Sequence, residues 1–262
     1  MIKSCIFDLG GTIVDRYSLT TYHSLRRAFL KYKLPIRDGL IYKDMGMEKV
    51  EHIHKILFDP HISRSFMKQY GEYPDTDDTY MIFGEFNRIQ KEYSKTIDII
   101  PETKDVIDYL REKKILIAVT TGFNKEVTDI ISNQLDKNDI KIDKYVSSSC
   151  LDAPSRPYPH MINHIMKDFK IDNPYEVMKI DDTAIGIEEG KMASTWTTGI
   201  ARWSTNMKIK EKDGYNDLSL FEQDKKLNET INILESTGPN YVFNTLDELP
   251  EMIGLLEFRM IR

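Results

Sequence analysis

Residues 2–12 read IKSCIFDLGGT. The apolar run that leads up to Asp8 predicts a short buried strand that ends on an acid. Gly10 and Gly11 then break the run, and Thr12 follows. Open α/β sheets bind their ligands outside the carboxyl ends of their strands. A strand that ends in an acid and a tight polar turn therefore predicts the first strand of such a sheet, with a functional site at its end.

Strands and helices alternate in the second part of the chain. Apolar runs rich in β-branched residues predict strands, and apolar residues at helical spacing predict helices. The expected strands cover residues 115–122, 145–149, 177–181, 195–201 and 241–243, and the expected helices cover residues 106–114, 124–136, 159–170, 185–193 and 246–259. This alternation indicates an α/β protein with a Rossmann-like parallel sheet and helices on both faces. Residues 202–230 are polar and give no clear pattern.

The pattern is different from about residue 18 to residue 98. Apolar residues recur at helical spacing, as Leu25 and Phe29 do, and no strand pattern is apparent. A loop is expected at residues 71–78, which read GEYPDTDD. The predicted division is an α/β core of residues 1–16 and 99–262, with a small helical cap domain of residues 17–98 inserted after the first strand.

The composition limits the kind of protein that this chain can be. The net charge of −6 lacks the basic footprint of a nucleic-acid-binding protein. No run of about 18 apolar residues predicts a membrane-spanning helix. Cys5 and Cys150 are too few for a disulfide framework in 262 residues, which indicates reduced thiols. We expect a cytoplasmic enzyme with a small-molecule substrate, and neither nucleic acid nor membrane as a partner.

Side chains suited to phosphorus chemistry follow four of the predicted strands. Asp8 ends the first strand, Thr121 ends the second, Arg156 follows the third, and Asp181 and Asp182 end the fourth. The ends of parallel strands converge on one crevice, so we expect these residues to lie together. Each of them alone has an ordinary structural explanation, such as capping the next helix. The four in this order favour a site.

The residue types fit the hydrolysis of a phosphorus compound. A carboxylate can attack phosphorus and form an aspartyl phosphate, which divides one difficult step into two. Two carboxylates can hold Mg²⁺, a cation that prefers oxygen ligands. Threonine hydroxyls and the planar fork of an arginine can bind phosphate oxygens. The sequence therefore predicts magnesium-dependent phosphorus chemistry at the strand ends.

In this order of motifs the chain resembles the haloacid dehalogenase superfamily. The pattern is DxxGT after a first strand, a threonine after the second, then a basic residue and finally an Asp pair, and the inserted helical segment is similar to that superfamily's small cap domain. The resemblance implies that Asp8 is the nucleophile and that Thr12 is among the phosphate-binding residues. It also implies that Mg²⁺ is held by Asp8, the backbone carbonyl of Gly10 and Asp182.

Gly10 separates the chain from most phosphatases of the superfamily. Those enzymes carry a second acid two residues after the nucleophile, and such general acids contribute roughly 10²–10⁴-fold to rate. The phosphonoacetaldehyde hydrolase family has a small residue at that position, and a lysine of its cap forms a Schiff base with the aldehyde. Resemblance to this family implies hydrolysis of the C–P bond of phosphonoacetaldehyde to acetaldehyde and phosphate, through a lysine Schiff base and an aspartyl phosphate.

Residues 45–53, MGMEKVEHI, are similar to the cap motif of that family. The similarity assigns Lys49 to the Schiff base, and Met45 and His52 to two other catalytic-site positions. On a helix, positions 45, 49 and 52 would share one face. Lys49 has to be neutral to attack a carbonyl, so burial or a nearby positive charge should lower its pKa. His52 is a candidate to relay protons.

Two further motifs extend the resemblance, and three positions depart from it. VTTGF (119–123) is similar to the family's phosphate-binding turn, with Thr121 and Gly122 as contacts. SRPYPHM (155–161) is similar to its motif around a phosphate-binding arginine, here Arg156. The departures are Phe123 for a tyrosine, Ser18 for a cysteine, and Gly186 for an acid four residues after the metal-binding Asp. Loss of that acid is expected to weaken Mg²⁺ binding.

Other interpretations remain open at this point. The chain could be a phosphatase-type hydrolase of the same superfamily that acts on another small phosphorylated substrate. It could also be a degenerate member without turnover, for which Gly186 is the main reason. Lys49 could be a solvated helix lysine paired with Glu48 or Glu51, while His52 and Met45 could be structural. The family also implies a homodimer.

Overall fold

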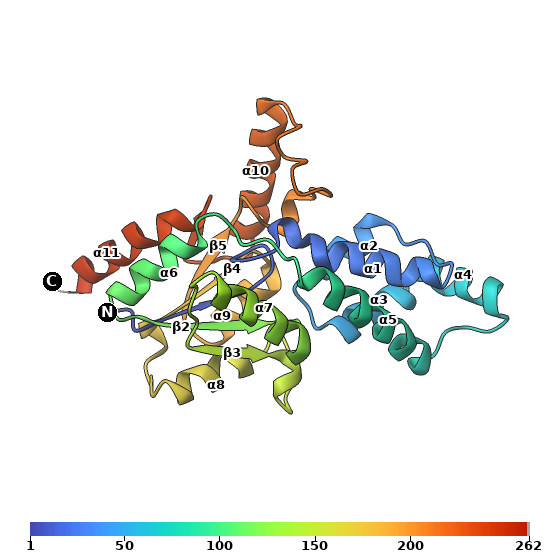
Figure 1. Cartoon of the computed structure of the whole chain (residues 1–262), viewed down its shortest axis with the longest axis horizontal. Coiled ribbons are helices and arrows are strands. Elements are labelled where there is room, and N and C mark those ends of the chain that lie inside the picture. Colours follow the sequence, from blue (N-terminus) through green and yellow to red (C-terminus); the bar gives the residue numbers. More distant parts are fainter. Residues whose placement is uncertain (261–262) are drawn as a thin grey trace.

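Six parallel strands form a single sheet in the computed structural model, which describes residues 1–260 and side chains as far as residue 256 (Figure 1). The strands are β1 (Ser4–Phe7), β2 (Leu116–Thr121), β3 (Lys144–Ser147), β4 (Val177–Asp181), β5 (Trp196–Ile200) and β6 (Tyr241–Phe243). Their order is β3-β2-β1-β4-β5-β6, and every neighbouring pair runs parallel. The predicted Rossmann-like parallel sheet is confirmed.

Helices cover both faces of the sheet. They are α6 (Thr103–Glu112), α7 (Lys125–Lys137), α8 (His160–Asp168), α9 (Ala184–Met192), α10 (Leu220–Glu235) and α11 (Leu249–Met260). Side chains alternate along each strand, so Cys5 and Phe7 pack with α6, α7 and α11, whereas Ile6 packs with α8 on the other face. Burial on both faces explains why the strands read as continuous apolar runs. Among residues 1–260, no helix is both long and apolar enough to cross a membrane.

β1 and β4 lie side by side at the point where the direction of chain progression across the sheet reverses. The chain builds β2 and β3 on one side of β1, and β4, β5 and β6 on the other. Folds of this kind bind ligands in the crevice outside the carboxyl ends of the strands at this reversal. Asp8 directly follows β1, and Asp181 is the last residue of β4. The topology therefore brings the first and the last acidic motifs to the same crevice.

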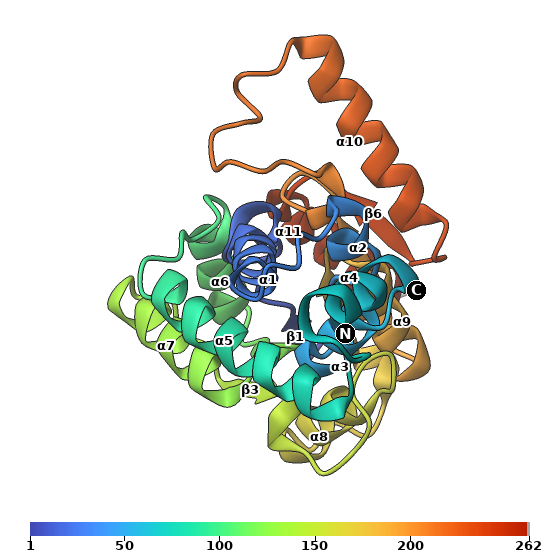
Figure 2. The ribbon, with the colours of Figure 1, turned by 90° about the vertical axis from the view of Figure 1, so that its right-hand side faces the viewer.

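A helical unit is inserted between β1 and β2. Its helices are α1 (Leu19–Lys31), α2 (Asp38–Lys43), α3 (Lys49–Leu57), α4 (Pro60–Tyr70) and α5 (Thr76–Ser94). They enclose a hydrophobic cluster of their own, which contains Leu25, Phe29 and Phe86, and α1 packs along α5 (Figure 2). The loop after α4 is shorter than predicted, because Asp75 and Asp78 form a capping box that starts α5 at Thr76.

The two segments that join the cap to the core lie side by side. Val14 forms a β-bridge with Ile99, and the Arg16 Nε atom lies 2.6 Å from Asp98 Oδ2. The two linker segments are therefore paired with each other at one place. Such a double connection suits a lid, because the cap can rotate about it without losing its own core.

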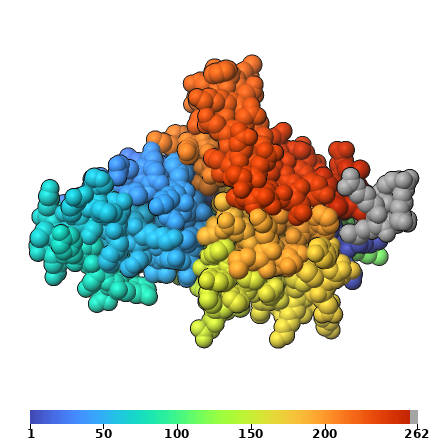
Figure 3. Space-filling view, turned by 180° about the vertical axis from the view of Figure 1, so that it is seen from behind, coloured from blue at the N-terminus to red at the C-terminus, as the bar shows by residue number. Residues whose placement is uncertain are grey.

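The segment 202–230, which had no clear sequence pattern, contains an irregular stretch and the first part of α10. This helix stands away from the rest of the core (Figures 2 and 3). Ser219 and Glu222 form a capping box at its start, so the S-x-x-E signal was present in the sequence. Phe221 is 77% exposed whereas Leu234 is fully buried, and the helix therefore packs on the sheet through its C-terminal part.

Candidate active site

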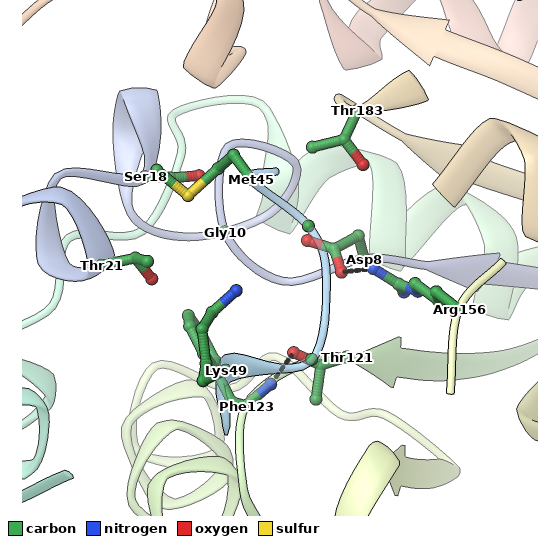
Figure 4. Close-up of a pocket in the computed structure, with 12 residues that line it drawn as sticks. Asp8, Gly10, Ser18, Thr21, Met45, Lys49, Thr121, Phe123, Arg156 and Thr183 are labelled. Atoms are coloured by element: carbon green, nitrogen blue, oxygen red, sulfur yellow. Dashed lines mark hydrogen bonds and ion pairs between the residues drawn. The ribbon is translucent and has the colours of Figure 1, made fainter. Parts of the chain in front are cut away.

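A small pocket lies between the cap and the carboxyl ends of the strands (Figure 4). The core contributes Asp8, Gly10, Thr121, Gly122, Phe123, Arg156 and Thr183, and the inserted segment contributes Ser18, Thr21, Met45, Gly46 and Lys49. The empty space within it is about 310 Å³, including the part open to solvent. The pocket brings the strand-end motifs and the cap motif together, in a space suited to a small substrate.

Arg156 connects three parts of the site from a buried position. Its Nη1 donates to Asp8 Oδ1 at 2.8 Å, its Nη2 donates to the Thr120 backbone oxygen at 2.7 Å, and its Nε donates to Glu189 Oε2 at 2.8 Å. Burial alone would lower the pKa of Arg156, but Glu189, Asp8 and Asp181 raise it above its ordinary value. Arg156 is therefore held as a cation beside Asp8, where the oxygens of a phosphorus group would need one.

Three carboxylates meet beside the pocket. One oxygen from each of Asp8, Asp181 and Asp182 lies within 4.8 Å of the other two. Burial is the main cause that raises the pKa of Asp8 to about 6 and the pKa of Asp182 well above its ordinary value, and repulsion from Asp181 adds to it in both cases. A bound divalent cation favours the ionised carboxylates and would reverse these shifts.

Lys179 and Glu189 complete a buried charge network that the sequence analysis missed. Lys179 Nζ lies 2.8 Å from Asp181 Oδ2 and 3.8 Å from Glu189 Oε2, and all three residues are fully buried. The signal was a lysine inside the apolar strand 177–181, since buried charges need partners. If every group is ionised, the four carboxylates Asp8, Asp181, Asp182 and Glu189 exceed the two cations Arg156 and Lys179 by two charges. Mg²⁺ prefers oxygen donors of negative charge, so the donor set fits the ion.

Lys49 enters the pocket from the first turn of α3. Its amine points into the space beside Asp8 and Met45 (Figure 4) and donates to the Met47 backbone oxygen at 2.8 Å. The residue is 5% exposed, which excludes the interpretation of Lys49 as a solvated helix lysine. Burial lowers the pKa of Lys49 to about 8, with Asp8 opposing and Arg156 adding to the shift. A buried lysine with a lowered pKa is a candidate nucleophile.

The expectation that positions 45, 49 and 52 share one helix face is wrong for Met45. α3 begins at Lys49, and Met45 lies in the turn before it. Gly46 has a φ of +92°, in the left-handed region, so the chain cannot continue as a helix through this position. Met45 still lines the pocket, because this turn folds over the core instead of extending α3.

Two predicted site residues, His52 and Thr12, lie behind the pocket and do not line it. His52 is fully buried in the cap, with Nε2 3.4 Å from the Leu40 backbone oxygen. Burial, with a contribution from Lys49, lowers the pKa of His52 to about 3, which favours the neutral ring. Because His52 does not line the pocket, the ring has no direct contact through which to relay a proton to a ligand there. The Thr12 hydroxyl donates to Asp182 Oδ1 at 3.5 Å, so Thr12 faces the carboxylate cluster of Asp8, Asp181 and Asp182 and does not line the pocket.

Thr121 and Gly122, at the end of β2, line the pocket together with Gly10, and their binding of phosphate stays a prediction. Thr121 Oγ1 accepts a hydrogen bond from the Phe123 N–H at 3.1 Å, which leaves the hydroxyl proton available to a ligand. A Cβ atom at Gly10 would lie 3.3 Å from Ser18 Oγ and 3.6 Å from Phe123 Cζ. The Asp15 Oδ2 atom follows at 3.8 Å, so two uncharged side chains and one carboxylate lie nearest the position at which most phosphatases of this fold carry their acid.

The cap is closed over the core. A Cβ atom at Gly46 would lie 2.7 Å from both Thr183 Oγ1 and Ile185 Cγ2, and one at Gly122 would lie 3.0 Å from the Met47 backbone oxygen. Polar pairs cross the rim between Asn87 and Asn124 at 2.9 Å, between Asp38 and Lys210 at 2.5 Å, and between Lys91 and Glu126. Closure buries Lys49 and limits the access of water to the pocket.

A family model described as haloacid dehalogenase-like hydrolase matches residues 2–194. The phosphonoacetaldehyde hydrolase of Latilactobacillus sakei subsp. sakei (strain 23K) is 32% identical over 254 residues, which cover 97% of this chain and 95% of that protein. The phosphonoacetaldehyde hydrolase of Paraburkholderia xenovorans (strain LB400) is 30% identical over 265 residues, which cover 100% and 97%. The similarity therefore extends through the core and the cap alike.

Solved structures show the same fold. A phosphonoacetaldehyde hydrolase-like protein from Oleispira antarctica matches with a TM-score of 0.93 and 23% identity, covering 98% of this chain and 93% of that one. A predicted phosphoglycolate phosphatase from Haemophilus somnus 129PT matches with a TM-score of 0.72 and 14% identity, covering 96% and 98%. At these identities the likeness concerns the fold alone.

Proposed function

Because the chain belongs to the haloacid dehalogenase-like hydrolase family and has phosphonoacetaldehyde hydrolases as relatives over nearly its full length, we propose that it hydrolyses phosphonoacetaldehyde to acetaldehyde and phosphate. The observation that carries this proposal is the position of Lys49. Its amine comes from the cap, is buried, and shares one small pocket with Asp8 (Figure 4). The proposed cleavage of the C–P bond uses an amine at the aldehyde end of the substrate and a carboxylate that attacks phosphorus at the other end.

In the proposed complex the phosphonate group lies next to Asp8. Arg156 offers its guanidinium, Thr121 offers a hydroxyl from the last residue of β2, and Gly122 offers a backbone N–H just after it. The aldehyde end then extends toward Lys49, since the closed cap leaves little other space. Mg²⁺, held by Asp8, the Gly10 carbonyl and Asp182, would supply positive charge to the phosphonate oxygens when bound.

The first chemical step activates the carbon as a leaving group. Neutral Lys49 attacks the aldehyde carbon and gives a carbinolamine. After the hydroxyl of this carbinolamine takes up one proton from solvent, it leaves as water and a protonated imine remains. A carboxylate oxygen of Asp8 then attacks phosphorus and the C–P bond breaks. Its electron pair moves into the C=N⁺ system and gives an enamine, so the carbon leaves without an external acid. The absence of an acid at Gly10 is consistent with such a leaving group.

The remaining steps regenerate both residues. Water attacks the aspartyl phosphate, releases phosphate and restores the Asp8 carboxylate. The enamine carbon takes a proton, and a second water hydrolyses the resulting imine to acetaldehyde and free Lys49. Both steps need water after the first cleavage, which a cap that opens and closes on its paired linkers can admit in turn.

The phosphatase alternative requires an acid for an alkoxide leaving group. Asp15 is the carboxylate closest to Gly10, with Oδ2 3.8 Å from a Cβ built there, and burial raises its pKa to about 7. However, Asp15 Oδ1 accepts hydrogen bonds from the Thr20 N–H and hydroxyl, both at 2.9 Å, and Asp15 does not line the pocket. The geometry therefore favours the C–P substrate over a phosphate ester.

Reductive trapping tests the proposal. The protein is incubated with phosphonoacetaldehyde and Mg²⁺, borohydride is added, and the adduct is located by peptide mass spectrometry while phosphate release is measured without reductant. We expect a reduced two-carbon adduct on Lys49 and release of phosphate. Lys49→Arg should lose the adduct and turnover by at least about 10³-fold while its melting temperature stays near that of the wild type, because the arginine guanidinium stays protonated and cannot form the imine.

Lys55→Arg is the matched control, since Lys55 lies on the same helix and is 43% exposed in its side chain. It should keep both the adduct and the turnover. Phosphate release without an adduct on Lys49 would support a phosphatase. Neither adduct nor phosphate would support a non-catalytic member, and normal turnover in Lys49→Arg would exclude the Schiff base.

A further inference from the structure

The side of the pocket that receives the Lys49 amine holds a threonine hydroxyl of the cap. Thr21, in the first turn of α1, lines the pocket and is 2% exposed. Figure 4 shows its hydroxyl directed toward the space that the Lys49 amine enters. Ser18, which also brings a hydroxyl from the inserted segment, lies against the loop after β1, with Oγ 3.3 Å from a Cβ atom built at Gly10. Thr21 is therefore the hydroxyl that faces the amine.

A buried glutamine sets the orientation of this hydroxyl. Gln90, on α5, is fully buried, and its Nε2 donates to Thr21 Oγ1 at 3.2 Å. This hydrogen bond occupies one acceptor site of the oxygen, so the proton of the hydroxyl has to point elsewhere. Among the described residues, the Thr21 hydroxyl donates to none. Its proton is therefore available to a ligand in the pocket.

The glutamine is unfavourable for the stability of the cap. Its neighbours on α5, Phe86 and Ile89, belong to the hydrophobic cluster of the cap. The Oε1 atom of Gln90 is buried and accepts no hydrogen bond from any described residue, and such an unpaired group costs about 1–3 kcal/mol. A hydrophobic side chain of similar size would avoid this cost. Since the bond to Thr21 is what the glutamine side chain makes within the described chain, its role is to orient that hydroxyl.

The attack of an amine on an aldehyde places charge on the aldehyde oxygen. As the bond between Lys49 Nζ and the carbon forms, the π pair of the C=O bond moves onto the oxygen. A donor aimed at this oxygen stabilises the charged form more than the neutral carbonyl and so lowers the barrier. The oxygen then gains the proton that the nitrogen loses, which gives the neutral carbinolamine, and the donor itself is unchanged.

We propose that Thr21 is a further catalytic residue, whose hydroxyl donates a hydrogen bond to the aldehyde oxygen while Lys49 attacks, and that Gln90 is the residue that positions it. The inference rests on the imine chemistry proposed above, because it concerns the first step of that reaction. Thr21 supplies the polar contact to the aldehyde that His52, which lies behind the pocket, does not make.

Thr21→Val tests the proposal, because it keeps the shape of the side chain and removes the hydroxyl. The initial rate of Lys49 adduct formation with phosphonoacetaldehyde and excess reductant, without Mg²⁺, is measured by peptide mass spectrometry. At about pH 9.5, above the Lys49 pKa of about 8, a change in the ionisation of the amine contributes little. We expect the rate to fall by at least about tenfold in Thr21→Val. Thr21→Ser, which keeps a hydroxyl donor, should stay within about threefold of the wild type.

Thr230→Val is the matched control. Thr230 is a fully buried threonine of α10, its hydroxyl has no hydrogen-bond partner among the described residues, and it does not line the pocket. The same change of side chain at this position should leave both the adduct rate and the melting temperature near those of the wild type.

Gln90→Met tests the positioning role. The hydroxyl of Thr21 can then rotate, so we expect a smaller loss of rate than in Thr21→Val. The double variant Thr21→Val/Gln90→Met should be no slower than Thr21→Val, because the glutamine acts through the hydroxyl and residues that act as one unit are not additive. The double variant also removes both members of the buried pair, so it should recover the melting temperature that Thr21→Val loses.

The outcomes separate this inference from the proposed reaction. An adduct rate in Thr21→Val equal to that of the wild type would overturn the role of Thr21 and leave the Lys49 imine intact. Losses that add in the double variant would show that Gln90 shapes the cap by itself and does not position the hydroxyl. A wild-type protein that forms no adduct would remove the proposed reaction, and this inference with it.

Discussion

Lys49 is a buried base whose surroundings oppose its charge. Its pKa falls from 10.5 to about 8. When Lys49 is charged, this difference lowers the free energy of unfolding by at most roughly 3 kcal/mol. The unfolded chain binds the proton more tightly, so this residue favours folding less as the pH falls from 10.5 toward 8. Stability is thus lower at neutral pH than a solvated lysine would allow. One pH unit below this pKa, Lys49 is neutral in about one-tenth of the molecules, and the neutral amine is the form that imine formation requires.

The pH dependence of imine formation follows from this pKa. The initial rate of Lys49 adduct formation, trapped with excess reductant in the absence of Mg²⁺, should rise about tenfold per pH unit below 8 and level off above it. Peptide mass spectrometry measures the rate, and a short lysine-containing peptide gives the behaviour of a solvated amine. A midpoint near that of the peptide would mean that Lys49 is solvated when substrate enters.

At the scale of elements, the turn at residues 45–47 decides the shape of the pocket. It interrupts the helical pattern, leaves Met45 outside α3, and inserts between the turn after β2 and the start of α9. Gly46 is required there for two reasons. Its φ of +92° is unfavourable for other residues, and any Cβ would contact Thr183 and Ile185 of the core.

Gly46→Ala should therefore hinder closure of the cap. We expect kcat/KM for phosphonoacetaldehyde to fall by at least about tenfold, because a misplacement near 1 Å at a reacting group can cost about 10²-fold. Gly71→Ala is the matched control, since Gly71 has a φ of +89° and no atom within 4 Å of its Cβ position. It should lower stability by about 1 kcal/mol and leave kcat/KM unchanged. Equal kcat/KM in both variants would mean that the turn does not govern closure.

At the scale of the whole molecule, the main feature is the position of the cap relative to the core. The paired linkers give the cap one place about which to move, and the contacts at the rim hold it shut. These rim contacts are polar and partly exposed, so each contributes little by itself. A lid that must open in every cycle is consistent with weak closing contacts.

Lys210→Met removes one such contact from the core side and leaves the pairing of Asp38 with Arg26 inside the cap. We expect a rise in KM of at most about fivefold at low salt, which 0.5 M salt should abolish because exposed ion pairs are screened. Lys212→Met, an exposed position in the same loop with the same change of charge, should have no effect. A loss in kcat alone for Lys210→Met would contradict a role in closure.

Local patterns in the sequence were sufficient for the fold and for part of the site. Apolar runs and helical spacing depend on neighbours a few residues apart, so they predicted the parallel sheet and the helical insertion. Asp8, Thr121 and Arg156 became candidates because each lies at or after the end of a predicted strand. α10 was missed although its S-x-x-E cap was present, because the polar residues around it gave no apolar stripe on which to place a helix.

The sequence by itself determined which strands form the sheet, where the cap is inserted, and that acids and phosphate binders stand at strand ends, because these features are written in short-range periodicity. Tertiary structure alone decided how the charges are arranged. Lys179, Asp181 and Glu189 meet only after β4 and α9 pack together, and Lys49 becomes buried only when the cap closes on the core. Burial and pairing depend on segments that are far apart in the chain, and those properties set the pKa values of these side chains and bring the carboxylates of Asp8, Asp181 and Asp182 together.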